Sequence, residues 1–424
     1  MAAGRGRLAR VFRALTWLGA LGGCLLAWWA GTLAAAAVTT EPAWFLGVGT
    51  LAAVVLWLLA CRLLLRTRTP WRRAAARLAG VLVVAATLVG VLLPMADPRR
   101  APRSAPDAGT WVLEDGSELA FGVVRGDGDA EEAPVLALHG GPGVPDTAGL
   151  LDALAPLAAD GHDVWAYDQR GTGRSTRLAD PSGYTTALAV ADLEQVRRRI
   201  GAERVILVGH SYGAYLAAAY TAEHPDRVER AVFLSPGGLE EHGVGGRPQA
   251  RLTRAQQWQV YRLLLHPRAL LAYALVQVDP AAAHAFADDP ELDARQDRVY
   301  AATLPALHCP GRTGPALHGL GFYANQVPQS WRHPPEPDIR ARLADTDVPA
   351  LVVKGQCDYL GWEAATGYLD AFDDSRLVYL DGAGHDVHVD APARVVEAVR
   401  SFLDGRPVPG TMTDPRRPPA GYQP

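Results

Sequence analysis

Hydrophobic residues follow two different patterns along this chain, and the change comes near residue 97. Before it lie three long apolar stretches, residues 15–38, 44–65 and 76–95. An apolar run of about 20 residues is long enough to cross a bilayer as a helix. We therefore expect a membrane anchor over residues 1–96 with three transmembrane helices. The third is the weakest prediction, because its uninterrupted apolar part is short.

After a linker at residues 97–109, short apolar runs alternate with helical patterns. The predicted strands are residues 110–113, 119–124, 134–138, 163–168, 204–209, 230–235, 350–354 and 376–380, and the predicted helices are residues 147–159, 186–200, 212–223 and 391–403. Continuous apolar runs are typical of parallel strands that are covered on both faces. Their alternation with helices predicts a doubly wound α/β sheet.

The alternation is interrupted once and then stops. We expect the α/β core to comprise residues 110–235 and 349–404, with a helical cap at residues 236–348 inserted between its two parts. Residues 405–424 are rich in proline, which favours a disordered tail.

Charge is distributed as unevenly as hydropathy. Of the net charge of −4, the first 100 residues contribute +10, with twelve arginines against Glu41 and Asp97. Four of these arginines precede the first span and five separate the second from the third, so the positive-inside rule makes those segments cytoplasmic. Three spans then place everything after residue 96 outside the cytoplasm, in a multi-pass protein of the cell membrane. If the third stretch does not insert, that part is cytoplasmic. We attribute the arginines to topology and expect no nucleic-acid partner.

The cysteines and histidines show no metal-ligand spacing, and we predict neither a metal nor a cofactor. Cys24 and Cys61 lie in the apolar stretches. Cys309 and Cys357 lie in the later part, where a disulfide outside the cytosol and two free thiols are both open.

One short segment has the pattern of a sharp strand-to-helix turn. A predicted strand leads into Gly209-His-Ser-Tyr-Gly213, and an alanine-rich helical stretch follows directly. This is the G-x-S-x-G nucleophile elbow, which exposes its serine at the apex of the turn. Gly209 and Gly213 are needed because a Cβ at either position would clash. Ser211 is therefore the candidate nucleophile.

A nucleophilic serine needs a base, and the base needs an acid that orients it. In α/β folds with this elbow, the three residues follow one another along the chain as Ser, Asp and His. Asp358 and His385 each come shortly after a predicted strand. Ligands bind at the carboxyl ends of strands in open α/β sheets. We therefore predict a triad of Ser211, Asp358 and His385.

Other residues compete for two of these roles. Asp347 and Asp381 are alternative acids, but Asp347 precedes its strand and Asp381 lies close before His385. His388 is an alternative base. His210, inside the elbow, is expected to pack or to form a local hydrogen bond.

The glycine-rich loop after the third predicted strand is a candidate oxyanion hole. It reads His139-Gly-Gly-Pro-Gly143, and glycines let backbone amides approach a substrate closely. Two donors are needed, each contributing about 3–4 kcal/mol. We predict the backbone N–H groups of Tyr212 and Gly141, with Gly140 as the second choice.

Three motifs in this order resemble the proline iminopeptidase branch of the α/β-hydrolases: His139-Gly-Gly-Pro-Gly143, Asp168-Gln-Arg-Gly-Thr-Gly-Arg-Ser175 and Gly209-His-Ser-Tyr-Gly213. The resemblance extends from about residue 109 to residue 403. It implies an α/β-hydrolase fold with a helical cap, here preceded by transmembrane helices. It also implies that the Asp168 loop is structural, with Arg170 shaping the site region.

The resemblance implies a serine hydrolase that forms an acyl-enzyme and acts as an aminopeptidase on a short peptide or other small molecule. Aminopeptidases of this family hold the substrate amine with glutamates on the cap. Here Gly319 stands where a similar segment begins with glutamate. Possible substitutes are Glu240, Glu241, Asp279, Asp288 and Glu291. An esterase or lipase-like hydrolase is the alternative, and a non-enzymatic membrane binding protein is a third hypothesis.

Overall fold

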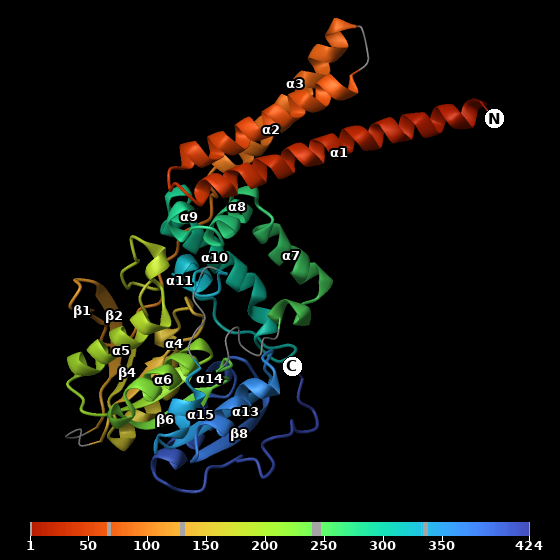
Figure 1. The fold of residues 1–424 in the computed structure, drawn as a ribbon. Coiled ribbons are helices and arrows are strands. Elements are labelled where there is room, and N and C mark those ends of the chain that lie inside the picture. The colour runs from red at the N-terminus through yellow and green to blue at the C-terminus, as the bar shows by residue number, and fades with distance from the viewer. Residues whose placement is uncertain are drawn as a thin grey trace. The chain divides into compact units, whose positions relative to one another are not determined.

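The computed structural model describes residues 2–65, 69–127, 132–239, 247–331, 333 and 338–423 (Figure 1). Arg66 and Arg68, two of the topology-setting arginines, and Glu240 and Glu241 lie outside the described residues. Contacts divide the chain into two compact units. One comprises Met1–Ala96 with Leu265–Asp288, and the other comprises Asp97–Leu264 with Asp289–Pro424.

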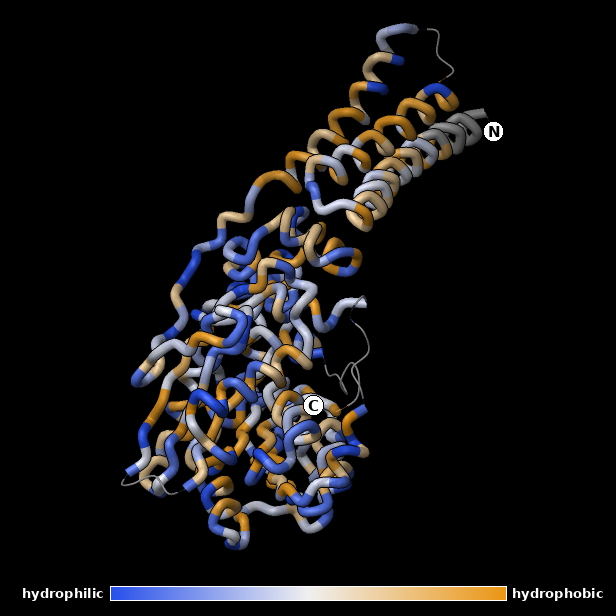
Figure 2. The backbone as a smooth tube through the Cα atoms, turned by 60° about the vertical axis from the view of Figure 1, so that its left-hand side comes forward, coloured by the Kyte–Doolittle hydropathy of each residue, from blue (hydrophilic) through white to orange (hydrophobic). Residues whose placement is uncertain are grey.

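The first unit is entirely helical. Its helices are α1 (Ala2–Ala36), α2 (Pro42–Leu64), α3 (Pro70–Leu92), α8 (Pro267–Val276) and α9 (Pro280–Phe286). Three stretches in it are long and apolar enough to cross a membrane, namely Ala14–Ala36, Pro42–Leu64 and Arg73–Leu92. Figure 2 shows the hydrophobic character of α2 and α3 over most of their length.

Small residues allow α1 and α2 to pack closely. A Cβ added to Gly49 of α2 would lie 2.0 Å from Oγ1 of Thr32 and 2.5 Å from the carbonyl oxygen of Trp28, both in α1. A side chain at Gly49 would therefore separate the two helices, as at other small-residue interfaces between apolar helices.

Helices α8 and α9 come from the middle of the predicted cap, yet they belong to this first unit. Arg268 of α8 donates hydrogen bonds to the carbonyl oxygens of Val91 and Phe286, at 3.0 and 2.7 Å. The ring of Phe286 in α9 also meets that of Phe45 in α2, with centroids 6.4 Å apart. The segment 236–348 is thus divided between the two units, because α8 is apolar enough to pack among the N-terminal helices.

The second unit contains an eight-stranded sheet in the order β1-β2-β4-β3-β5-β6-β7-β8. Its strands are β1 (Gly109–Val112), β2 (Glu118–Val124), β3 (Val135–Leu138), β4 (Val164–Tyr167), β5 (Val205–His210), β6 (Val228–Leu234), β7 (Ala350–Cys357) and β8 (Ser375–Gly384). The pairs β1–β2 and β2–β4 are antiparallel and all the others are parallel. The predicted mostly parallel α/β sheet is confirmed, with each of the eight predicted strands present.

Helices cover both faces of the sheet, as the continuous apolar strands require. One hydrophobic cluster includes α5 (Thr186–Ile200), α6 (Tyr212–Glu223), α12 (Arg340–Ala344) and α13 (Trp362–Ala371). The opposite cluster includes α4 (Thr147–Leu154), α14 (Val387–Asp390) and α15 (Pro392–Leu403). Successive residues of β5 alternate between the two clusters, so every strand position is buried on one side or the other.

The remaining helices of this unit are short or belong to the insertion. They are α7 (Arg254–Leu264), α10 (Asp289–Thr303), α11 (Phe322–Gln326) and the 3-10 turns η1 (Ala155–Asp160), η2 (Pro181–Gly183), η3 (Pro225–Arg227), η4 (Pro248–Arg251) and η5 (Leu304–Ala306). Helix α10 and η4 supply residues to the cavity described below.

The C-terminal segment, which the sequence favours as disordered, makes specific contacts along the end of the sheet. Trp362 donates to the carbonyl oxygen of Pro415 at 2.9 Å, and Gln356 donates to that of Gly421 at 3.0 Å. The hydroxyl of Tyr422 donates to the carbonyl oxygen of Leu360 at 2.5 Å. The two aromatic residues, Trp362 and Tyr422, also meet edge to face.

Candidate active site

Ser211 lies in a strained turn between β5 and α6. Its φ and ψ are 55° and −115°, a conformation that few non-glycine residues adopt. The turn leaves no room for neighbouring side chains: a Cβ on Gly209 would lie 2.3 Å from the Gly213 carbonyl oxygen, and a Cβ on Gly213 would lie 2.2 Å from that of Leu138. Both glycines of the motif are therefore sterically required.

Asp358 and His385 meet although 27 residues separate them. Asp358 directly follows β7, and His385 directly follows β8. Nδ1 of His385 lies 2.8 Å from Oδ1 of Asp358. The backbone N–H of His385 donates to the carbonyl oxygen of Leu307 at 2.6 Å, which fixes the loop that carries the imidazole. Ser211 and His385 line the same cavity.

Asp358 is buried in surroundings that favour its ionised form. The exposed fraction is 0% for Asp358, 3% for His385 and 8% for Ser211. Burial by itself would raise the pKa of Asp358, but the Lys354 ammonium and His385 outweigh it and hold that pKa well below its usual range. An anionic Asp358 is the form that can accept the Nδ1 proton of His385.

The alternative acids and base lie elsewhere. Asp347 precedes β7 and is exposed, and Asp381 forms an exposed ion pair with Arg394. His388 is 2% exposed and its Nε2 lies 2.8 Å from Oδ2 of Asp146. Each therefore has surroundings that account for it without a role beside Ser211.

The glycine loop follows β3 and runs beside the elbow. A Cβ on Gly140 would lie 3.0 Å from the Cβ of Ser211, so the backbone of this loop comes close to Ser211. Gly141 has φ 119°, which a side chain rarely permits. Gly140, Gly141 and Tyr212 all line the cavity with Ser211.

His139 and Gly143 hold this loop from two sides. Nε2 of the buried His139 accepts from the backbone N–H of Gln169 at 2.9 Å, which is consistent with a neutral ring since burial lowers the His139 pKa. The carbonyl oxygen of Gly143 accepts from the N–H of Gly321 at 2.9 Å. A Cβ on Gly143 would lie 2.6 Å from the Gly321 carbonyl oxygen, so the cap segment can approach only a glycine here.

Asp168 and Arg170 organise the loop after β4. Asp168 accepts from the Thr147 hydroxyl at 2.5 Å. Arg170 pairs with Asp192 and with Asp115, each at 2.7 Å. Hydrogen bonding to Asp192 raises the pKa of Arg170, although burial opposes it. Neither Asp168 nor Arg170 is among the described residues that line the cavity, so both act on the site through its framework.

The cavity beside Ser211 has a volume of about 630 Å³. Its lining residues come from the strand-end loops on the one hand and from α10, η4, Leu307 and the segments around α11 on the other. Asp146 and Asp386 are its carboxylates, and no lysine or arginine occurs among the described lining residues. Gly319 is not a lining residue: a Cβ there would face Gly173 and Pro102.

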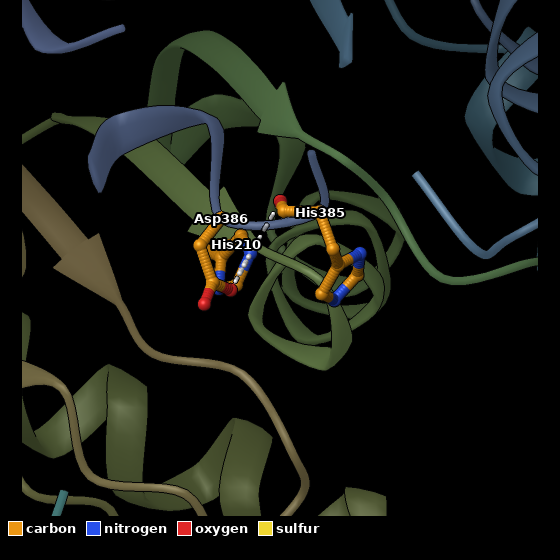
Figure 3. Close-up of side chains that lie close together, drawn as sticks. All are labelled: His210, His385 and Asp386. Carbon is orange, nitrogen blue, oxygen red and sulfur yellow. Dashed lines mark hydrogen bonds and ion pairs between the residues drawn. The ribbon is translucent and has the colours of Figure 1, made fainter. Parts of the chain in front are cut away.

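His210 and Asp386 form a buried contact beside the base that the sequence did not reveal. Nε2 of His210 lies 3.1 Å from the His385 carbonyl oxygen and 3.5 Å from Oδ1 of Asp386 (Figure 3). Burial, with His388 and His385 nearby, lowers the pKa of His210 well below its usual value. A neutral His210 that donates from Nε2 to the His385 carbonyl helps to fix the backbone of His385.

The same three side chains have the composition of a metal site. Ligand atoms of His210, His385 and Asp386 lie within 4.8 Å of one another. However, Nδ1 of His385 is bonded to Asp358, and Nε2 of His210 is occupied by the His385 carbonyl. Hydrogen bonding therefore accounts for this cluster without an ion.

The sequence left open whether Cys309 and Cys357 form a disulfide or two free thiols, and the structure contains the disulfide. Cys309 and Cys357 are joined by an S–S bond of 2.03 Å. The bond ties the segment after η5 to the last residue of β7, directly before Asp358.

Comparisons with known proteins agree with this architecture. A family model described as alpha/beta hydrolase fold matches residues 133–392. The chain is 26% identical over 280 residues to the abhydrolase domain-containing protein abhd-5.2 of Caenorhabditis elegans, covering 64% of this chain and 60% of that one. It is 28% identical over 288 residues to the proline iminopeptidase of Lactobacillus delbrueckii subsp. lactis, covering 64% of this chain and 90% of that one.

A solved structure, the proline iminopeptidase of Mycobacterium smegmatis, aligns with a TM-score of 0.47 at 23% identity, covering 70% of this chain and 98% of that one.

Proposed function

Because the chain belongs to the alpha/beta hydrolase fold family, we propose that it is a serine hydrolase with Ser211 as nucleophile, His385 as base and Asp358 as the orienting acid. The observation that carries the proposal is the 2.8 Å contact between His385 and Asp358 beside a serine held in an elbow conformation. A serine, an imidazole and a carboxylate in this chain order are the components of acyl transfer in this fold.

In the proposed reaction, Nε2 of His385 takes the proton of Ser211 as its oxygen attacks the substrate carbonyl. The backbone N–H groups of Tyr212 and of Gly141 or Gly140 stabilise the resulting oxyanion, each contributing about 3–4 kcal/mol. His385 then protonates the leaving group, and an acyl-enzyme remains on Ser211. Water, activated by the same imidazole, releases the acyl group.

We infer that the substrate is a short peptide or other small molecule with a free amine, and that the enzyme is an aminopeptidase of proline iminopeptidase type. The cavity supports this inference because its charged lining residues are Asp146 and Asp386, without a lysine or arginine among the described ones. A buried ammonium needs a carboxylate nearby. The similarity to the Lactobacillus proline iminopeptidase points the same way.

One observation favours the alternative, an esterase or lipase-like hydrolase. Gly319 occupies the position where the resemblance calls for glutamate, and a side chain there would face Gly173 and Pro102 instead of the cavity. The other acids considered do not fill this role: Asp279 caps α9 and Asp288 also lies in the first unit, while Glu291 is not a lining residue.

A comparison of substrates on the full-length protein in detergent tests these proposals. Labelling of Ser211 by a fluorophosphonate probe is expected, and its absence contradicts the serine-hydrolase proposal. The aminopeptidase proposal expects faster turnover of prolyl-β-naphthylamide than of its N-acetylated form. Turnover of p-nitrophenyl esters without any preference for a free amine supports the esterase instead.

We further propose that the N-terminal helices anchor the protein in the cell membrane, with the catalytic unit outside the cytoplasm. Three stretches have the length and composition of membrane spans, and the disulfide between Cys309 and Cys357 fits an oxidising compartment. Reporter fusions after residue 105 test this topology. Activity of a reporter that works only in the cytosol would contradict it.

A further inference from the structure

Lys354 lies beside the acid of the proposed triad, although no motif assigns it a role. It is the only lysine among the 424 residues. Its side chain and that of Asp358, four residues later, are both 0% exposed. Burial of an ammonium is unfavourable unless the group is paired and hydrogen-bonded. A single lysine at such a position therefore calls for an explanation.

The two oxygens of Asp358 have different partners. Oδ2 accepts from the Lys354 ammonium at 2.6 Å, whereas Oδ1 accepts from the backbone N–H of Leu360 at 3.1 Å and contacts His385 at 2.8 Å. Lys354 also donates to the carbonyl oxygen of Leu360 at 3.0 Å. The ammonium thus fixes both the carboxylate and the loop that follows it, and it leaves the other oxygen to the imidazole.

The C-terminal segment closes the other side of this ion pair. The ring of Tyr422 lies 6.0 Å from Nζ of Lys354, within range of a cation–π interaction. Its hydroxyl donates to the same Leu360 carbonyl that accepts from Lys354. The described charged or titratable groups near the proposed acid and base include Lys354, Arg251, Glu363, Tyr359, Tyr422, His210, His388 and Asp386.

Among these groups, Lys354 alone brings a cation into hydrogen-bond contact with the carboxylate. Arg251 is directed instead to the backbone, where it donates to the carbonyl oxygen of Cys357. His210 and Tyr359 pack against the base, with ring centroids 4.9 and 4.6 Å from that of His385.

We propose that Lys354 is a positioning residue of the triad, which holds Asp358 in place and partly offsets its charge. This inference rests on the proposed function. Because the ammonium pairs with the oxygen that does not face the imidazole, it weakens the attraction between the carboxylate and a positive charge on that ring. We therefore expect the enzyme to stay active at a lower pH than it would with an uncompensated carboxylate.

The directions of the pKa shifts of Lys354 and Asp358 are those expected of a buried pair in which both groups are charged. Burial lowers the pKa of Lys354, and the Asp358 carboxylate opposes that change. Conversely, Lys354 helps to hold the pKa of Asp358 below its usual range in spite of burial.

The first test is the pH dependence of kcat/KM in the full-length Lys354→Met variant. Loss of the cation should move the acidic limb of the profile upward by about one to two pH units and lower the plateau. Lys354→Arg, which keeps the charge, should keep the limb close to its wild-type position. Arg251→Met is the matched control, because it removes a nearby cation that does not touch the carboxylate, and its limb should move much less.

An unmoved limb in an active Lys354→Met enzyme overturns the inference, as does an equal movement in Arg251→Met. A purely structural role would lower the plateau in Lys354→Met without moving the limb. Fluorophosphonate labelling distinguishes a failure of the proposed function from a failure of the proposed role of Lys354. A wild-type protein that is not labelled contradicts the proposed function, whereas a labelled enzyme with an unmoved limb contradicts the role of Lys354 alone.

A second measurement needs no folded variant. Since the chain has one lysine, protein labelled with [ε-¹³C]lysine gives a single side-chain signal, which reports the charge of Lys354 directly. The shift of a charged ammonium is expected throughout the pH range of activity. A neutral amine at pH 7 would overturn the inference.

Discussion

The two sides of the cavity differ in how their residues are held. On the floor, made by the loops after β3, β5, β7 and β8, Ser211, Asp358 and His385 are each fixed by a turn, a strand end or a buried hydrogen bond. The roof, made by α10, η4 and the segments around α11, contributes residues such as Val299, Tyr300 and Leu317. The difference teaches that the chemistry depends on backbone geometry, whereas substrate choice depends on side-chain shape and charge.

The largest effect is expected on the floor, at the nucleophile. Ser211→Ala removes the only proposed attacking group and should lower kcat by about 10⁶-fold. Steady-state kinetics with the best substrate measures this loss, and near-normal turnover would assign the chemistry to another residue. Gly209→Ala is not a useful comparison, because its Cβ would clash within the elbow.

The next largest effect should come from the acid. Asp358→Asn keeps the size of the side chain but presents the wrong hydrogen-bonding partner to Nδ1 of His385, so kcat should fall by about 10⁴-fold. Asp381→Asn, which removes an exposed carboxylate on the same sheet edge, is the control and should leave kcat unchanged. Similar losses in both variants would argue against Asp358 as the orienting acid.

The disulfide is the covalent connection between the roof segment and the floor. Replacing Cys309 and Cys357 together by serine opens a loop with a sequence separation of 48 residues. On a chain-entropy account, this lowers the free energy of unfolding by about 4 kcal/mol at most. Thermal unfolding with and without reductant measures the effect. Reductant should destabilise the wild type and leave the double variant unaffected.

Substitution in the roof should change selectivity more than chemistry. Val299→Phe fills part of the cavity and should lower kcat/KM for a bulky acyl group by roughly 10- to 100-fold, with a much smaller change for an acetyl ester. The ratio of the two rates is the readout. An equal loss for both substrates would mean that the roof also positions the catalytic groups.

The smallest effect is expected away from the cavity, at Glu194 of α5. Hydrogen bonds and ion pairing with Arg197, opposed by burial, lower the pKa of Glu194 to about 2. The unfolded chain binds the proton more tightly, so this stabilisation is complete above the ordinary value near 4.5 and is lost as pH falls toward 2. Glu194→Gln should therefore be less stable than wild type by roughly 1 kcal/mol or less at pH 7. The difference in Tm should vanish near pH 2, and a constant difference would contradict this account.

The floor was more predictable from the sequence than the roof, because turns and strand ends depend on local backbone geometry. A tight turn can be recognised in the local sequence, because a strand that turns into a helix around an exposed serine needs glycines, here Gly209 and Gly213. Strand ends are similarly marked by apolar runs, which located Asp358 and His385. The central strands β3, β4 and β5 were predictable because each is buried at every position.

Contacts between distant segments have no local sequence motif by which they can be recognised. The His210 contact with the His385 carbonyl spans 175 residues, and nothing in the local sequence distinguishes it from an ordinary packed histidine. Lys354 could have been noticed as the sole lysine directly after an apolar strand, but its partner is visible only in the structure. The contacts of Tyr422 were equally hidden, because proline-rich composition alone favours disorder.

The placement of α8 and α9 has a consequence for protein engineering. A chain shortened to begin at Asp97 would keep the segment 265–288 but lose the helices against which Arg268 and Phe286 pack. Their apolar faces would then be exposed to water, which favours aggregation. The membrane-spanning candidates are therefore not a detachable module, and a soluble form would need α8 and α9 redesigned or replaced by a short connection.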